Sequence, residues 1–250
     1  MVLLVDIGNT RVKWCLAEKG ELGQRHCLIH HGELSRLFDD PAWRATARPE
    51  RVVLSSVLAM EQTVCLSSWI ETQWGCAAQF VEPARRACGV TNGYTEARRL
   101  GADRWAALIG ARHTVAGAVC LFDCGTALTM DMLDADGLHH GGLIMPGLRM
   151  MRDALTRQSD ALYFAVDEML EEGVLPPLAT DTPSAVIRGT LHTMVAVMER
   201  IVKRMEMEQE ITVLVTGGDA EVLLPWMERP CQHRPDLVLQ GLAVIGGGGA

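Results

Sequence analysis

Two segments of this chain each join an apolar run to a short turn that contains aspartate and glycine. Met1–Val5 leads into Asp6-Ile-Gly-Asn-Thr10, and Ala118–Phe122 leads into Asp123-Cys-Gly-Thr-Ala127. Glycine lets the backbone approach a ligand without an intervening Cβ. Amide and hydroxyl groups in such a turn can donate to phosphate oxygens, and the aspartate can hold an accompanying cation. One Asp-x-Gly alone indicates an ordinary hairpin turn. Because the pattern occurs in each half, we interpret it as two phosphate-binding turns that clamp a nucleotide.

A third segment, Thr216-Gly-Gly-Asp219, follows a predicted buried strand and precedes a predicted helix. Two glycines at such a turn allow a flat group, such as adenine or ribose, to lie on bare backbone. Asp219 is interpreted either as a ligand of a ribose hydroxyl or as a helix cap.

Charged residues that could act on a second substrate stand in Gly101-Ala-Asp-Arg104, where a helix is predicted to begin. Asp103 is either an N-cap or a general base. The planar fork of Arg104 could bind both oxygens of a carboxylate. Lys13 follows the first turn on a strand, where it is either a solvated residue or a cation that neutralises phosphate. The nearby turn favours the second interpretation.

The elements that must position these residues follow from apolar periodicity and turn residues. Strands are predicted at 1–5, 12–17, 24–30, 51–55, 79–81, 119–122, 128–133, 138–144 and 211–215, and helices at 61–74, 103–115, 148–156 and 184–207. A further helical stretch is expected to begin at 35–39, and 89–95 is expected to be a loop.

The second half repeats the opening of the first, so we predict two α/β domains, 1–117 and 118–250. The last apolar segments are expected at 237–239 and 242–245, before a flexible tail at 246–249.

Composition excludes several classes of protein. The 250 residues are 48% hydrophobic and 22% charged, with a formal net charge of −8, so no basic stripe for nucleic acid is expected. No apolar run has membrane-spanning length, and Asp6 interrupts the first one too early for a signal peptide, so we expect a cytoplasmic protein with no membrane partner. The eight cysteines are expected to be reduced. The doublets His30-His31 and His139-His140 are expected to be surface residues in turns, because neither has a third metal ligand at suitable spacing.

Taken in order, the motifs resemble those of type III pantothenate kinase, from residue 2 to about 245. The resemblance rests on Asp6-Ile-Gly-Asn-Thr10 with Lys13, Asn92-Gly-Tyr94, Gly101-Ala-Asp-Arg104, Asp123-x-Gly-Thr-Ala127-x-Thr129, Gly142-x-x-x-Pro146-Gly147 and Thr216-Gly-Gly-Asp219.

The resemblance implies an actin-like ATPase fold of two duplicated ribonuclease-H-like domains, working as a homodimer. It implies transfer of the ATP γ-phosphoryl group to pantothenate, the first step of coenzyme A biosynthesis, with Mg²⁺ and a monovalent cation, K⁺ or NH₄⁺. A dimer would also cover apolar residues of the helix at 184–207, namely Val186, Ile187, Met194, Val195, Val197 and Met198.

Carried over position by position, the resemblance assigns the site residues. Asp103 would be the proton acceptor, and Asp123 a ligand of the monovalent cation. The substrate pocket would consist of Tyr94, Gly101, Ala102, Asp103, Arg104 and Thr182. The ATP phosphates would meet Asp6, Ile7, Gly8, Asn9, Thr10, Arg11, Val12, Lys13 and Thr126. The chain departs from the family pattern at Ala97, where proline is usual.

Two rival hypotheses come from other functional classes. One is an actin-like-fold kinase that phosphorylates another small acceptor. The other is a non-enzymatic transcription accessory factor. Retention of five charged residues argues against this alternative, namely Asp6, Lys13, Asp103, Arg104 and Asp123.

Overall fold

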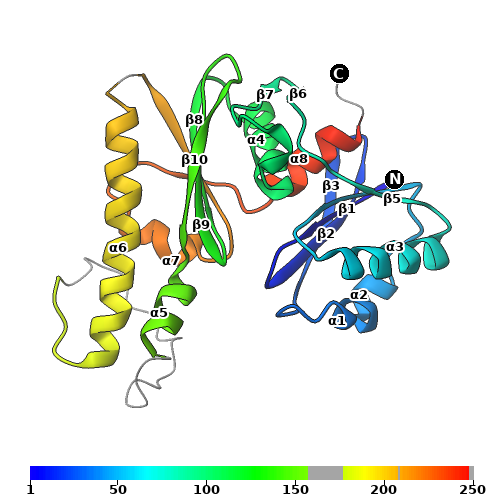
Figure 1. Cartoon of the computed structure of the whole chain (residues 1–250), viewed down its shortest axis with the longest axis horizontal. Helices are drawn as coiled ribbons and strands as arrows, with labels where there is room; N and C mark the ends of the chain where they lie inside the picture. The colour runs from blue at the N-terminus through cyan, green and yellow to red at the C-terminus, as the bar shows by residue number, and fades with distance from the viewer. Residues whose placement is uncertain (157–176, 208, 248–250) are drawn as a thin grey trace. The chain divides into compact units, whose positions relative to one another are not determined.

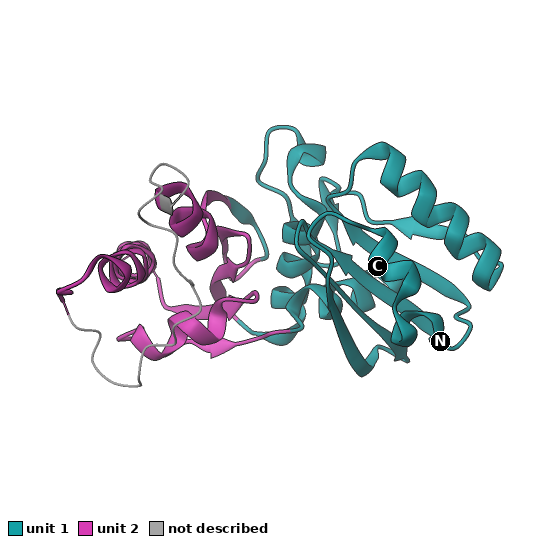
Figure 2. Cartoon of the chain, turned by 90° about the horizontal axis from the view of Figure 1, so that it is seen from below, with its two compact units in different colours: residues 1–116, 137–140, 236–250 teal, residues 117–136, 141–235 magenta. Residues whose placement is uncertain are grey.

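The computed structural model describes residues 1–156, 177–207 and 209–247, which fall into two compact α/β units. Figure 2 shows the first unit, residues 1–116, 137–140 and 236–250, and the second unit, residues 117–136 and 141–235. The C-terminal helix therefore belongs to the first unit. Whether the chain consists of two domains divided at residue 117 stays a prediction.

The first unit is built on a five-stranded sheet of order β3-β2-β1-β4-β5. The central strand β1 pairs antiparallel with β2 and parallel with β4. The outer strands continue this pattern, since β3 is antiparallel to β2 and β5 is parallel to β4. The strands are β1 (Val2–Ile7), β2 (Arg11–Glu18), β3 (Glu21–Ile29), β4 (Arg51–Ser56) and β5 (Ala78–Phe80).

Helices cover both faces of this sheet. On one face, α1 (Ser35–Asp39), α2 (Pro41–Arg44) and α3 (Met60–Trp74) bury a core that includes Leu3, Val5 and Ile7 of β1. The other face carries the even-numbered residues of β1.

On that second face, α8 (Leu237–Gly246) lies against Val2 and Leu4, and α4 (Ala102–Thr114) packs on α8 and β4. The two helices approach closely at Gly241, where a Cβ would overlap the carbonyl oxygen of Ala106.

The second unit repeats the strand order, with β10-β9-β8-β11-β12. Its central strand β8 pairs antiparallel with β9 and parallel with β11, and β11 is parallel to β12. The same strand order, with the same pairing directions around β8 as around β1, confirms the structural repeat that the two turn motifs predicted. The strands are β8 (Ala118–Cys124), β9 (Ala127–Leu133), β10 (His139–Pro146), β11 (Ile211–Thr216) and β12 (Gln232–His233).

The long helix α6 (Thr182–Met205) lies alongside this sheet (Figure 1). It buries Ile187, Met194 and Met198 in the core of its own unit. The expectation that these three residues need another subunit to cover them was therefore wrong. The remaining helices are α5 (Leu148–Thr156), α7 (Ala220–Leu223) and the 3₁₀ turn η3 (Leu224–Trp226).

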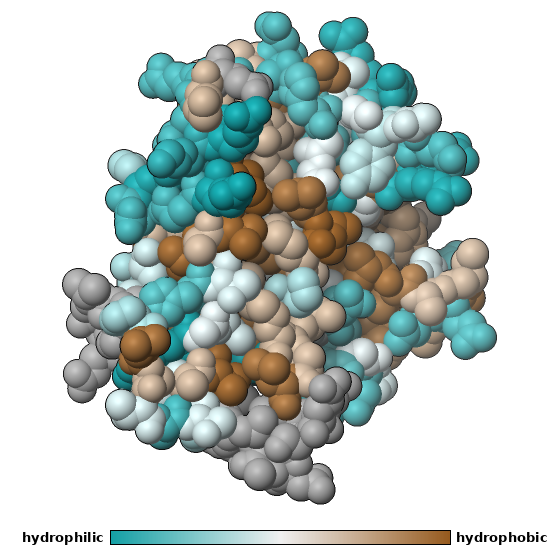
Figure 3. All heavy atoms as spheres, turned by 60° about the vertical axis from the view of Figure 1, so that its left-hand side comes forward, coloured by the Kyte–Doolittle hydropathy of each residue, from teal (hydrophilic) through white to brown (hydrophobic). Residues whose placement is uncertain are grey.

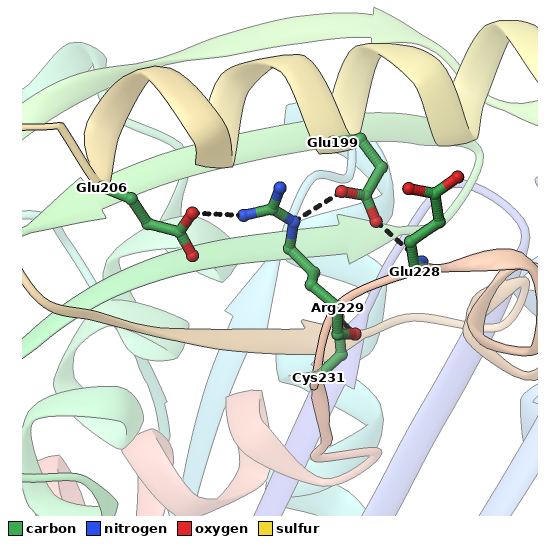
Figure 4. A network of polar contacts seen from close by, with 5 residues as sticks. All are labelled: Glu199, Glu206, Glu228, Arg229 and Cys231. Atoms are coloured by element: carbon green, nitrogen blue, oxygen red, sulfur yellow. Dashed lines mark hydrogen bonds and ion pairs between the residues drawn. The ribbon is translucent and has the colours of Figure 1, made fainter.

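An arginine fastens the end of α6 to the segment before β12 (Figure 4). The Arg229 guanidinium donates to Glu199 Oε2 at 2.5 Å and to Glu206 Oε2 at 2.6 Å. Glu199 Oε1 also accepts from the Glu228 amide at 2.9 Å. Partial burial opposes the charge of Arg229, but the hydrogen bonds with the two glutamates raise its pKa.

Three local expectations were wrong. The predicted loop 89–95 contains β7 (Val90–Thr91), which pairs with β6 (Arg86–Ala87). The segments 237–239 and 242–245 form one helix, α8, which includes Gly246 of the expected tail; residues 248–249 of that tail lie outside the described residues. His30 and His139 are fully buried rather than on the surface. Across the described residues, no helix has the length and apolar character needed to cross a membrane.

Candidate active site

The first predicted phosphate turn connects β1 to β2. The Gly8 amide donates to Arg11 O at 3.0 Å and closes the turn. A Cβ at Gly8 would have Arg11 O as its nearest neighbour, at an ordinary 3.5 Å, and Gly8 does not have a positive φ. Neither packing in the described chain nor backbone geometry therefore requires glycine here. Room for a ligand is the remaining physical reason that we identify for it.

A buried histidine, His30, supports this turn from the position that directly follows β3. The Gly32 amide donates to His30 Nδ1 at 3.1 Å, and His30 Nε2 lies 2.9 Å from Gly8 O. Because Nδ1 accepts a hydrogen bond, the proton is on Nε2, which donates to the Gly8 carbonyl. The His30 amide also donates to Thr10 O at 2.9 Å. His30 thus holds both ends of the turn, a role that sequence analysis missed.

Asp6 and Lys13 are opposite each other on β1 and β2, and Ser55 is beside Asp6 on β4. Residues paired in register project from the same face of a sheet. The three side chains therefore form a polar row on the face that α4 and α8 cover. Asp6 and Lys13 are half-buried, although one Asp6 carboxylate oxygen, Oδ1, is itself buried.

The second predicted phosphate turn connects β8 to β9, where the Gly125 amide donates to Ala127 O at 3.1 Å. Two further motifs meet it. A Cβ at Gly147 would lie 2.5 Å from Thr126 O, and one at Gly217, which has φ +96°, would lie 2.5 Å from Asp123 Oδ1. The structure thus brings the Pro146-Gly147 and Thr216–Asp219 motifs against this turn.

Asp219 is at the N-cap position of α7, but its side chain makes no capping hydrogen bond. Its amide donates to Cys124 O at 2.8 Å. Burial raises the pKa of the Cys124 thiol well above its usual range, so this cysteine is a poor nucleophile.

The first turn of α4 carries the residues predicted to act on the acceptor. Gly101, rather than Asp103, is the N-cap residue of α4. Asp103 lies within the first turn of the helix. The half-buried Asp103 accepts a hydrogen bond from the Arg104 amide through Oδ1, at 2.8 Å. A Cβ at Gly101 would lie 2.5 Å from this Oδ1, so glycine leaves the space that the carboxylate occupies.

Arg104 and Tyr94 are brought together in the first unit. The buried guanidinium of Arg104 donates to the Tyr94 hydroxyl at 2.8 Å, and its Cζ lies 5.5 Å from the centre of the tyrosine ring. The ring of the buried His139 stacks on Tyr94 with centroids 5.7 Å apart.

The fully buried Asn92 holds the Tyr94 loop, since it accepts from the Tyr94 amide at 3.0 Å and donates to Ala97 O at 3.1 Å.

Comparison with known proteins decides the family. The sequence profile of type III pantothenate kinase matches residues 2–204. A type III pantothenate kinase of Nitrosococcus oceani is 36% identical over 98% of this chain and 93% of the relative. One of Burkholderia mallei is 35% identical over 98% of both chains. The chain belongs to the type III pantothenate kinase family.

Solved structures support the fold of this family member. A protein named for the Baf family of transcriptional activators, from Campylobacter jejuni, has a TM-score of 0.60 and 17% identity, with 99% of this chain and 100% of that chain covered. The ADPNP-bound activator of the 2-hydroxyisocaproyl-CoA dehydratase from Clostridium difficile has a TM-score of 0.53 and 11% identity, with 99% and 94% covered. These likenesses show the fold alone. The prediction of an actin-like ATPase fold with duplicated ribonuclease-H-like domains is confirmed.

In this kinase, the predicted site residues divide between the two units. The first unit contains residues 6–13, Tyr94 and the start of α4, whereas the second contains Asp123, Thr126 and Thr182. Thr126 is exposed in its turn, and Thr182 is the exposed first residue of α6, next to the N-cap Asp181. That these residues share one site with those of the first unit stays a prediction.

Proposed function

We infer that this kinase transfers the γ-phosphoryl group of ATP to the primary hydroxyl of pantothenate, forming 4′-phosphopantothenate, the first step of coenzyme A biosynthesis. The observation that carries this conclusion is the similarity over the full acceptor and nucleotide regions, 36% identity over 98% of the chain. A likeness restricted to the nucleotide-binding motifs would support only an ATP-dependent enzyme.

We propose that residues 6–13 bind the ATP phosphates, with Thr126 as a further contact. Two observations support this role. Among the described residues, a Cβ at Gly8 would make only one contact, at an ordinary 3.5 Å, so the turn has room for a ligand, and Asp6 and Lys13 are register partners on the adjoining strands. Mg²⁺ in such kinases is held by one or two carboxylates together with substrate phosphates, so Asp6 suits the protein side of that site. The bound ion offsets phosphate charge, and Lys13 adds a positive charge on the same face.

Asp103 is proposed as the acceptor of the pantothenate hydroxyl proton, and Arg104 as the residue that binds its carboxylate. Both roles fit the first turn of α4, where Asp103 is half-buried and Arg104 is held by Tyr94. Phosphoryl transfer depends on positioning and charge neutralisation more than on covalent chemistry. Tyr94, Gly101, Ala102 and Thr182 complete the proposed substrate pocket.

A monovalent cation, K⁺ or NH₄⁺, is proposed at Asp123. The chemistry of the available donors fits such an ion, because Asp123 Oδ1 and the Cys124 carbonyl oxygen lie close together, both no more than 2.5 Å from the position that a Cβ would take at Gly217. Oxygen donors are the ligands that hard cations prefer. Glycines at 125 and 217 keep Cβ atoms away from the carboxylate, with Gly217 the more tightly packed of the two.

We further propose that the kinase is a cytoplasmic homodimer. Figure 3 shows patches of apolar side chains, separated by polar ones, on the surface that it presents. Leu143 and Ile144 are 49% and 65% exposed on β10, the edge strand of the second sheet. An exposed apolar edge strand favours association with another subunit.

An acceptor panel tests the proposed function. ATP consumption with pantothenate, simple sugars and acetate should reveal turnover with pantothenate alone. Turnover with another acceptor but not with pantothenate would favour the alternative of a different actin-like-fold kinase. Nucleotide binding without turnover on any acceptor would favour a non-enzymatic factor.

A further inference from the structure

Ser55, at the end of β4, has a buried hydroxyl that no described hydrogen bond satisfies. The residue is 0% exposed, and among the residues that the structure describes no group bonds its Oγ. Buried hydroxyl groups nearly always have a partner, because burial without one destabilises the fold. Alanine would fit the same strand position without that penalty. The hydroxyl therefore calls for an explanation outside the folding of the chain alone.

The position of Ser55 suggests which group it serves. It is the register partner of Asp6, which is in turn the register partner of Lys13. Neighbouring strands lie about 4.8 Å apart, so a serine hydroxyl can reach a carboxylate oxygen on the next strand. Ser55 thus lies on the far side of Asp6 from Lys13, on one face of the sheet.

The repeated unit has a hydroxyl at the equivalent place. Thr216 on β11 is the register partner of Asp123 on β8, as Ser55 is of Asp6, and it is only 2% exposed. The residues that precede the two hydroxyls, Leu54 and Val215, are fully buried and apolar. A hydroxyl residue therefore recurs beside each motif aspartate, directly after a buried apolar residue of its strand.

We propose that Ser55 is a positioning residue for Asp6 in nucleotide binding. With Mg²⁺ and ATP bound, the Ser55 hydroxyl would donate a hydrogen bond to one Asp6 carboxylate oxygen and so leave the other oxygen to ligate the metal ion. The orphaned hydroxyl of the structure is then satisfied in the loaded state. This inference rests on the proposed role of Asp6 in binding Mg²⁺ and ATP.

The test compares Ser55→Ala with the matched control Ser56→Ala. Ser56 is on the opposite face, and its Oγ accepts from the Leu58 amide at 3.1 Å. Two quantities are measured for each variant: the melting temperature without nucleotide, and the calorimetric Kd for the non-hydrolysable analogue AMP-PNP with Mg²⁺. Ser55→Ala should melt at or above the wild-type temperature and bind the analogue about tenfold more weakly, the usual effect of losing a hydrogen bond to a charged group. Ser56→Ala should melt lower and bind the analogue as the wild type does.

Unchanged affinity in Ser55→Ala would overturn the proposal, and so would a lowered melting temperature, which would show that the hydroxyl stabilises the free protein. The proposed function fails by a different result, namely a wild-type protein that binds AMP-PNP but does not phosphorylate pantothenate.

Discussion

Replacing Gly101 by alanine should reduce turnover while leaving the fold intact, because the added methyl group would meet the Asp103 carboxylate. The Cβ would lie 2.5 Å from Asp103 Oδ1, whereas ordinary contacts begin at 3.4 Å. Gly101 has φ −61° and ψ 142°, which alanine adopts without strain. The conflict must therefore be relieved by movement of the carboxylate, which is the end of a rotatable side chain.

The geometry sets the expected size of each effect. Restoring ordinary contact moves the carboxylate oxygen by about 1 Å, and a misplacement of this size can lower a rate about 10²-fold. Alanine is a poorer N-cap than glycine, but removing glycine gains about 0.4–1 kcal/mol through the unfolded state. These terms oppose each other, so the free energy of unfolding should change by less than about 1 kcal/mol.

The assay is turnover at saturating ATP and pantothenate, with thermal unfolding of the same samples. Gly189→Ala in α6 is the matched control, because no described atom beyond its chain neighbours and the adjacent helix backbone lies within 4 Å of its added Cβ. The control should gain about 0.5–1 kcal/mol in stability and keep full turnover. Native turnover of Gly101→Ala would refute the argument that the Asp103 carboxylate must occupy this space for catalysis.

Four other predictions follow from the site and the fold. Asp103→Asn should lower turnover about 10²–10⁴-fold with native melting; native turnover would exclude a proton-accepting role. If Asp123 holds a monovalent cation, activity should be lost in sodium-only buffer and return with potassium or ammonium, and equal rates in all three salts would contradict this. Light scattering at assay concentration should give twice the 27.3 kDa chain mass, whereas a fully active monomer would refute the dimer. In urea denaturation, Arg229→Ala should cost about 1–3 kcal/mol, between the values of exposed and buried ion pairs; the exposed Arg204→Ala should cost less than about 0.5 kcal/mol, and equal losses would argue against the network.

Repetition made much of the fold predictable. The two Asp-x-Gly turns follow apolar strands in each half, and the structure has them at the same place in two sheets of identical strand order. Long amphipathic helices such as α3 and α6 were also predictable, since their buried residues recur at helical spacing. Helix α8 was not identified as one helix, because its residues are apolar on nearly every side and give no helical periodicity.

The supporting residues of the site could not be predicted from their local sequence. His30 and His139 resemble ordinary turn residues, and only the tertiary fold reveals their burial against Gly8 and Tyr94. Ser55 is far from Asp6 in the sequence, and the two become neighbours only because β4 pairs in parallel with β1 in this register. Asp103 shows a different limit, since sequence left open a cap or a base, whereas the structure has Gly101 at the cap position.

The central claim is that this chain phosphorylates pantothenate, and direct detection of the product tests it best. The purified protein would be incubated with ATP, Mg²⁺, potassium and pantothenate, and 4′-phosphopantothenate and ADP would be quantified by mass spectrometry. The account predicts that the two products form in equal amounts, and that neither accumulates when pantothenate is omitted. ADP formation without phosphopantothenate, or no reaction at all from folded protein that binds ATP, would contradict it.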